Sequence, residues 1–269
     1  MATKVHLLCI DPQNDFCDPK GSLFVSGADK DIERLSKMMD RIYPKLDDIH
    51  ITMDCHQLVH IAHPIFWVDA SGNHPTPFTL ISTEDIENGT WRCSFPQYQN
   101  WCLKYTQNLK KNNRYLLCIW PPHCLIGEWG NNIHPMFSAS YRPYLELGGV
   151  INFVSKGSNF LTEHYSAVKS DVPDPSDPTT QIQTGEGSLI HTCKERADLI
   201  AITGQALSHC VANTIRDIAN SFGEDNIKKF VLLEDTTSSV PGFENLGTDF
   251  VSEMIGRGMQ VTTSDKFLL

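Results

Sequence analysis

Residues 197–219 have the sequence ADLIAITGQALSHCVANTIRDIA, which changes from one regular structure to another partway along. Its first part, 198–203, is a short apolar run that ends at Gly204, and such a run is typical of a fully buried strand. In its last part, Val211, Ile215 and Ile218 recur at the spacing of one helix face. The stretch therefore predicts a strand that leads through a short loop into a helix.

Cys210 lies where that loop meets the helix. The first turn of a helix carries unpaired backbone N–H groups and the positive end of the helix dipole. Both features favour a thiolate over a thiol, and the same N–H groups stabilise an oxyanion. The position alone leaves two interpretations open: a nucleophile, or a small buried apolar residue.

Composition limits the class of protein. The chain has 269 residues, of which 41% are hydrophobic and 20% charged, and this fits one large α/β domain over residues 1–269. A formal charge of −10 argues against nucleic acid or an anionic membrane as a partner.

The termini and the thiols indicate a cellular compartment. No apolar run is long enough to span a membrane, and the run at 5–10 is too short for a signal peptide. Nine cysteines, an odd number without a close pair, fit reduced thiols better than a disulfide framework. We therefore expect a cytoplasmic protein.

Strands and helices alternate along most of the chain, which predicts an α/β fold with a parallel sheet and helices on both faces. Polar residues end four of the strands, and the carboxyl ends of parallel strands meet at one edge, so these residues should share one site. They are Asp11 after 5–10, Asp54 after 48–53, Lys156 after 149–154 and Cys210 after 198–203. Further strands are expected at 115–120, 229–233 and 258–263, and helices at 29–43, 98–109, 134–147, 188–196 and 245–255.

Histidines follow two of these strands. Asp54-Cys-His56, with His60 four residues on, has the residue types of half a divalent metal site. His123 lies in a loop introduced by Pro121 and Pro122, which could present a fixed ligand. In both places a histidine that is only hydrogen-bonded remains the alternative.

Residues 67–113 are rich in Pro, Gly, Asn and Ser and have little periodicity. We expect them to form a long inserted excursion over the site, because loops of this length tend to be functional or disordered.

With these residues in place, the chain resembles the isochorismatase-like cysteine hydrolases and, among them, the nicotinamidases. The segment Asp11-Pro-Gln-Asn-Asp-Phe-Cys is similar to the family's opening motif, and Lys156-Gly157 followed by Tyr-Ser-Ala is similar to its lysine motif. Gly-Gln-Ala-Leu-Ser-His-Cys210-Val is similar to its nucleophile loop. The resemblance covers most of the chain outside 67–113. It implies a three-layer, doubly wound fold with a six-stranded, mainly parallel sheet, and a catalytic triad of Cys210, Asp11 and Lys156.

The metal motifs select the nicotinamidases within this family. By resemblance, Asp54, His56 and His123 hold one divalent metal, with His60 nearby. Zinc suits this mixed N/O ligand set, which also admits iron or manganese. The resemblance also implies an oxyanion hole at Cys210 and Leu207 or a neighbour, shaped by a cis peptide near 205–207. Phe16 and Trp120 are candidates for the walls around the substrate ring, or else plain core aromatics.

Two departures from the family pattern concern the shape of the pocket. Cys55 stands where the family has Trp, and Glu128-Trp129 replaces a small Thr-Gly stretch.

The resemblance implies an amidohydrolase that converts nicotinamide to nicotinate and ammonia through a thioester, in NAD salvage. The expected partner is a small-molecule amide, and the resemblance allows a homo-oligomer. Two alternatives remain: a related hydrolase of ureido or carbamoyl substrates, and a non-catalytic binding protein on the same scaffold. Relatives acting on ureido substrates generally lack the metal set, and a chain freed from catalysis should have lost part of the triad.

Overall fold

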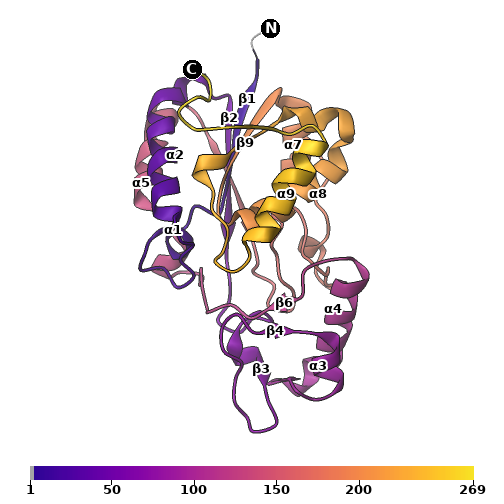
Figure 1. The fold of residues 1–269 in the computed structure, drawn as a ribbon. Coiled ribbons are helices and arrows are strands. Elements are labelled where there is room, and N and C mark those ends of the chain that lie inside the picture. Colours follow the sequence, from indigo (N-terminus) through magenta and orange to yellow (C-terminus); the bar gives the residue numbers. More distant parts are fainter. Residues whose placement is uncertain (1–2) are drawn as a thin grey trace.

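Six strands form the central sheet of the computed structural model, which describes residues 3–269 (Figure 1). The strand order is β10-β9-β8-β1-β2-β7, and every neighbouring pair is parallel. The strands are β1 Val5–Ile10, β2 Asp48–Asp54, β7 Ile151–Lys156, β8 Leu199–Gly204, β9 Phe230–Leu233 and β10 Gln260–Thr262. The expected α/β fold with a six-stranded sheet is confirmed.

The inner strands are apolar because both faces of the sheet are covered. All six residues of β1 are buried, as are five of the six in β8. A parallel sheet flanked by helices needs such nearly continuous apolar runs.

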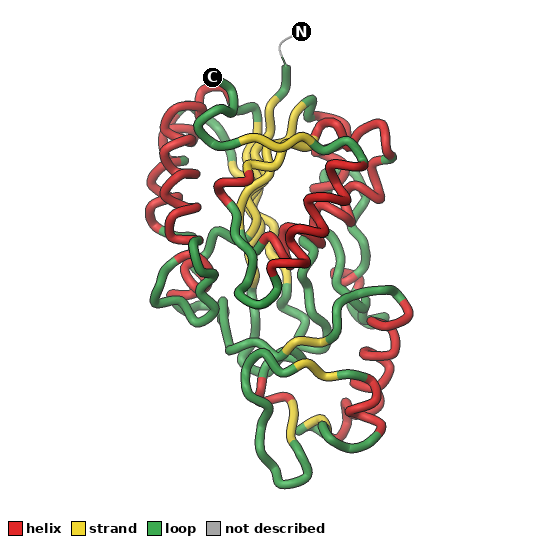
Figure 2. Tube along the Cα trace, viewed as in Figure 1, coloured by secondary structure: helices red, strands yellow, loops and turns green. Residues whose placement is uncertain are grey.

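Helices lie on both sides of the sheet (Figures 1 and 2). On one side α2, Ala28–Ile42, packs against α5, Pro135–Ser140. On the other, α8, Ala212–Phe222, packs against α7, Leu189–Arg196, and α9, Glu244–Gly256. The apolar stripe of α2 is buried and the opposite side of that helix faces solvent. The short helix α1, Asn14–Cys17, follows β1 directly.

The topology brings β1 and β8 together at the point where the chain changes direction across the sheet. From β1 the chain continues to its neighbour β2, and after β7 it returns to β8 on the other side of β1. Open α/β sheets bind ligands outside the carboxyl ends of strands at such a switch point. Asp11 and the loop before Cys210 lie there.

Two expected elements were wrong in detail. Residues 115–120 do not join the main sheet: only β6, Leu117–Cys118, is a strand, and it pairs antiparallel with β4, Leu80–Ile81. An apolar run does not reveal which sheet it joins. Residues 134–147 form two helices, α5 and α6, Arg142–Glu146, because Pro143 lacks the N–H that would continue the first one.

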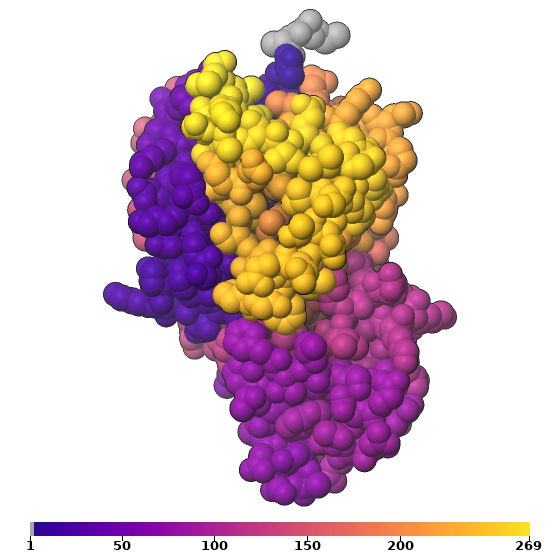
Figure 3. Space-filling view, in the orientation of Figure 1, coloured from indigo at the N-terminus to yellow at the C-terminus, as the bar shows by residue number. Residues whose placement is uncertain are grey.

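The segment 67–113 gathers beyond the carboxyl ends of the strands, where its purple and magenta atoms form the lower end of the molecule (Figures 1 and 3). It contains the antiparallel pair β3, Trp67–Val68, and β5, Arg92–Cys93. It also contains two helices: α3, Thr83–Glu87, lies between these two strands in the chain, and α4, Gln99–Lys111, follows them. The helix expected at 98–109 is confirmed by α4. Within residues 3–269, no helix has both the length and the apolar character needed to cross a bilayer.

Gly204 permits the close approach of β8 to β1 at the switch point. Its φ is +114°, and a Cβ there would lie 2.0 Å from the carbonyl oxygen of Ile10. We predict that Gly204→Ala lowers the free energy of unfolding by at least about 2 kcal/mol, through backbone strain and this clash. Urea unfolding checks this, with Gly185→Ala as control because a Cβ there meets nothing within 4 Å. Equal stability of the two variants would contradict the prediction.

Candidate active site and metal centre

Asp11 begins the site at the end of β1. Its backbone N–H donates to the carbonyl and to the hydroxyl oxygen of Thr52, at 3.2 and 3.1 Å. The Thr52 hydroxyl in turn donates to Asp11 Oδ1. Thr52 thus fixes the carboxylate from the neighbouring strand, and it shares a face of β2 with Asp54 because alternate strand residues project to the same side.

Lys156, the last residue of β7, places a fully buried ammonium group at the centre of the site. Its Nζ lies 2.9 Å from Asp11 Oδ2, 3.1 Å from Asp54 Oδ1 and 3.6 Å from Cys210 Sγ. It also donates to the carbonyl of His164 at 2.9 Å. The structure therefore brings together the three predicted triad residues and one predicted metal ligand.

The pKa directions follow from this geometry. Burial opposes the charge on Lys156, but Asp11 and Asp54 outweigh it and hold the pKa of Lys156 well above its usual value. Burial raises the pKa of Asp11, and Lys156 offsets part of that rise. Burial raises the pKa of the Cys210 thiol, against the pull of Lys156. The expected bias toward thiolate is thus outweighed by desolvation, and Cys210 needs a base to take its proton.

Cys210 lies in a π-helical turn, Leu207–Val211, that leads into α8. The peptide bond between Gln205 and Ala206 is cis, at the place expected from the resemblance. Leu207, an expected oxyanion donor, gives its N–H to the carbonyl of Ser238 at 2.8 Å. Its neighbour Ala206 has no hydrogen-bond acceptor for its N–H among the described residues.

Asp54, His56 and His123 form a compact ligand set whose donor atoms all lie within 4.8 Å of one another. Nε2 of His56 is 3.1 Å from Asp54 Oδ2, and Nε2 of His123 is 3.5 Å from the same oxygen. The Nδ1 atoms face carbonyl oxygens, those of Gly157 at 3.1 Å and Pro121 at 2.8 Å.

These contacts test whether the residues fit a metal. A carbonyl only accepts, so each Nδ1 carries a proton, and the lone pair that each ring can offer to an ion is on Nε2, which faces Asp54. His56 Nε2 is buried without a hydrogen-bond partner, whereas Asp54 Oδ1 is paired with the Lys156 ammonium, which leaves Oδ2 to face the two rings. Two lone pairs aimed at a carboxylate oxygen suit a divalent cation, so the donor set fits the ion that the resemblance implied.

Neighbouring groups hold these ligands in place. The side chain of Gln13 donates to the carbonyl of Asp54 and accepts its N–H, both at 2.7 Å. Asp15 Oδ2 accepts the N–H of Cys124, next to His123, at 2.6 Å. Gly157 has a φ of +85°, and a Cβ there would lie 2.8 Å from Asp54 Oδ1, so only glycine lets the chain pass this close.

His60 and His63 surround His56 in different ways. The ring of His60 lies 4.4 Å from that of His56, but its Nδ1 accepts the N–H of Ala62 and its Nε2 faces the carbonyl of Thr162. His63 Nε2 is buried without a partner. His60 is therefore beside the ligand set, as expected, with both of its nitrogens already engaged.

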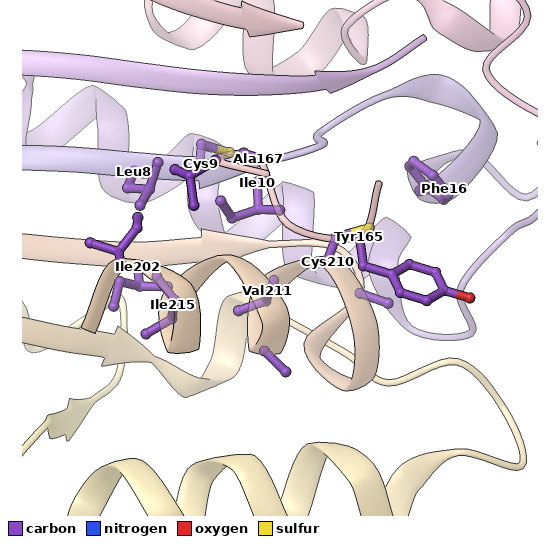
Figure 4. Close-up of a cluster of buried hydrophobic side chains, with 14 of the residues drawn as sticks. Leu8, Cys9, Ile10, Phe16, Tyr165, Ala167, Ile202, Cys210, Val211 and Ile215 are labelled. Atoms are coloured by element: carbon purple, nitrogen blue, oxygen red, sulfur yellow. The ribbon is translucent and has the colours of Figure 1, made fainter. Parts of the chain in front are cut away.

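The cavity above Cys210 is mainly apolar. It is lined by Phe16, Leu23, Val25, Asp54, Trp120, His123, Glu163, Tyr165, Ala206, His209, Cys210 and Val240. Phe16, Tyr165 and Cys210 lie together beyond the packed strand residues (Figure 4). Phe16 and Trp120, the two residues predicted as ring walls, both line this cavity. Cys55, Glu128 and Trp129 are not among its lining residues, so these departures from the family pattern lie outside the cavity wall.

Glu163 is a site residue that the sequence analysis missed. Its side chain is buried, Oε1 accepts the N–H of His164 at 2.8 Å, and Oε2 has no partner. Burial raises its pKa. One of its carboxylate oxygens lies within 4.8 Å of a ring nitrogen of His56 and of His60. Only its place soon after Lys156 could have indicated it.

Asp11, Asp54 and Cys210 also lie within 4.8 Å of one another through one atom each. The Lys156 ammonium lies within ion-pair or hydrogen-bond distance of all three, so the positive charge that this group needs is already supplied by the protein. The candidate metal centre is therefore the Asp54, His56 and His123 set.

No protein-family model matches the chain, and no curated protein matches it significantly in sequence. Solved structures do match. A nicotinamidase–pyrazinamidase from Acinetobacter baumannii is 21% identical over 100% of both chains, with a TM-score of 0.65. The yeast nicotinamidase bound to the inhibitor nicotinaldehyde is 20% identical over 96% of this chain and 99% of that one, with a TM-score of 0.66.

A pyrazinamidase from Pyrococcus horikoshii in complex with zinc is 17% identical over 97% of this chain and 99% of that one, with a TM-score of 0.55. The chain therefore has the fold of nicotinamidase structures, and the resemblance is confirmed at the level of the fold.

We predict that Lys156→Met destabilises metal-free protein by about 3–5 kcal/mol at pH 8, because Asp11 and Asp54 lose their counter-charge. The pKa of Asp11 is already raised by burial and should rise further without Lys156. An acid whose folded pKa lies above its unfolded pKa costs stability at high pH, and the cost falls as pH drops through the folded value. The loss should therefore be smaller at pH 5.5 than at pH 8.

Urea unfolding at both pH values measures this effect. Lys169→Met is the control, since Lys169 is 30% exposed and its partner Asp217 keeps its contact with Arg114. An equal loss at both pH values would show that Asp11 does not take up the proton.

Proposed function

We propose that this chain is an amidohydrolase that converts nicotinamide to nicotinate and ammonia, in NAD salvage. The observation that carries the proposal is the position of Lys156, whose ammonium contacts Cys210, Asp11 and Asp54 together. A nucleophile, a base and a metal ligand thus adjoin one small cavity. The shared fold with nicotinamidases supports the same activity.

The chemistry starts from the neutral thiol. Asp11 takes the proton of Cys210 Sγ as the sulfur attacks the amide carbon, and it then gives that proton to the departing ammonia. Lys156 stabilises both negative groups throughout, since it lies against each of them. Water, activated by the freed Asp11 carboxylate, hydrolyses the thioester to nicotinate and restores the thiol.

The negative oxygen that forms in each step needs donors already in place. The backbone N–H groups of Cys210 and Ala206 would supply them, since Ala206 lines the cavity with its N–H free. Leu207 would not, because its N–H is committed to Ser238.

The metal site would orient the substrate. Asp54, His56 and His123 would hold one divalent ion, most suitably zinc. As a Lewis acid, this ion would bind the pyridine nitrogen. Phe16 and Trp120 would contact the ring, while Cys210 lies on the same cavity as Asp54 and His123. This arrangement favours a small heteroaromatic amide over a linear ureido substrate, which has no ring nitrogen to bind.

The first prediction concerns the nucleophile and the base. Cys210→Ala should abolish ammonia release from nicotinamide, and Asp11→Asn should lower kcat by about 10²–10⁴-fold, as is typical of lost general acid–base catalysis. Cys193→Ala is the control, because this buried cysteine lies in α7, outside the cavity. Ammonia release by the Cys210→Ala variant would exclude a thioester on Cys210. Inactivity of the unaltered chain with every amide would favour a non-catalytic scaffold.

The second prediction concerns the metal. Benzamide has the shape of nicotinamide without the ring nitrogen, so its kcat/KM should be at least tenfold lower. Tenfold corresponds to a difference of about 1.4 kcal/mol in the free energy of binding the transition state. His56→Ala should lose both the ion and this preference, while Cys210 stays open to alkylation. Elemental analysis and kinetics on the same samples measure the loss of the ion and the loss of the preference. A metal-free protein that still prefers nicotinamide would refute the orienting role and favour the ureido alternative.

A further inference from the structure

A second group of metal-ligating side chains lies at the amino edge of the sheet. We define the amino-edge cluster as His6, Asp48 and His50. His6 stands opposite Asp48 in the register of β1 and β2, and His50 shares a face of β2 with Asp48. Asp54 is six residues further along this strand, which at about 3.3 Å per residue is about 20 Å away. The cluster is therefore separate from the candidate active site.

The distances within the cluster suit a bound ion. Nδ1 of His6 lies 3.1 Å from Nε2 of His50, and Oδ2 of Asp48 lies 3.9 Å from the same Nε2. One ligating atom from each residue lies within 4.8 Å of the other two. Tetrahedral zinc with bonds of about 2.0–2.1 Å places neighbouring ligand atoms about 3.3 Å apart. The two nitrogens are already near that spacing, and Asp48 Oδ2 is about half an ångström farther than that from His50 Nε2.

The surroundings leave the ligand atoms available. Asp48 Oδ1 accepts the N–H of Ile49, whereas no described group donates a hydrogen bond to Oδ2. The Asp48 side chain is 28% exposed, which gives an ion a path from solvent and room for a water ligand. Nδ1 of His50 lies 3.2 Å from Nδ2 of Asn152. With an ion on Nε2, Nδ1 of His50 carries the proton, and Asn152 can accept it once its amide turns to present Oδ1.

Without an ion, the two imidazoles can share one proton in a hydrogen bond. When both facing nitrogens bind an ion, that proton moves to the other nitrogen of its own ring, so no net proton is released.

We propose that His6, Asp48 and His50 form a second metal site, which takes one divalent transition-metal ion such as zinc. Two imidazole nitrogens and one carboxylate oxygen are ligands that zinc, nickel and copper accept, whereas calcium and magnesium require oxygen ligands. The site does not depend on the activity of the chain, because none of its residues lines the cavity at Cys210.

Equilibrium dialysis of chelator-treated protein against Zn²⁺, followed by elemental analysis, tests the proposal. The unaltered chain should bind two ions, His6→Gln one, and Asp54→Asn one. His74→Gln is the control and should bind two, because His74 is exposed and belongs to neither group. His6→Gln should keep the ammonia release of the unaltered chain.

An equal zinc content in His6→Gln and the unaltered chain would overturn the proposal, as would the absence of zinc in Asp54→Asn. If His6→Gln does not fold, Asp48→Asn replaces it, because the Asp48 side chain is partly exposed. We expect this variant to bind the second ion at least tenfold more weakly. Cu²⁺ added to Asp54→Asn gives an independent readout by electron paramagnetic resonance. Coupling to two imidazole nitrogens supports the site, and coupling to none refutes it.

Discussion

The ammonium group of Lys156 is the interaction on which the candidate site depends. It is fully buried, and within 3.6 Å it meets the carboxylates of Asp11 and Asp54 and the sulfur of Cys210. Burying a lysine alone would be very costly, so its partners are as necessary to the fold as to any chemistry. Two carboxylates against one ammonium leave excess negative charge. A divalent ion on Asp54, His56 and His123 would offset that excess.

The parallel sheet makes this meeting of charges possible. Asp11, Asp54 and Lys156 stand at the carboxyl ends of β1, β2 and β7, which are adjacent in the sheet. Cys210 comes from the loop after β8, on the other side of β1. The same geometry at the amino ends of β1 and β2 brings two histidines and an aspartate together. One pair of strands thus carries buried polar groups at both of its ends.

The strands and the site residues could be predicted from sequence because apolar runs mark buried strands and polar residues end them. Membership of a sheet could not be predicted for 115–120, since its pairing with β4 depends on tertiary contacts. Glu163 and Gln13 were missed because their roles rest on burial and on hydrogen bonds to distant segments. The direction of the Cys210 pKa could not be predicted for a similar reason: local dipoles are visible in sequence, whereas desolvation of Cys210 is not.

Hydrolysis through a thioester requires that Cys210 carries the acyl group of the substrate during turnover. Rapid acid quenching of the metal-loaded enzyme with saturating nicotinamide, followed by peptide mass spectrometry, measures this directly. We expect a nicotinoyl adduct on the peptide that contains Cys210. Ammonia release with no adduct, or with an adduct on another cysteine, would contradict the account.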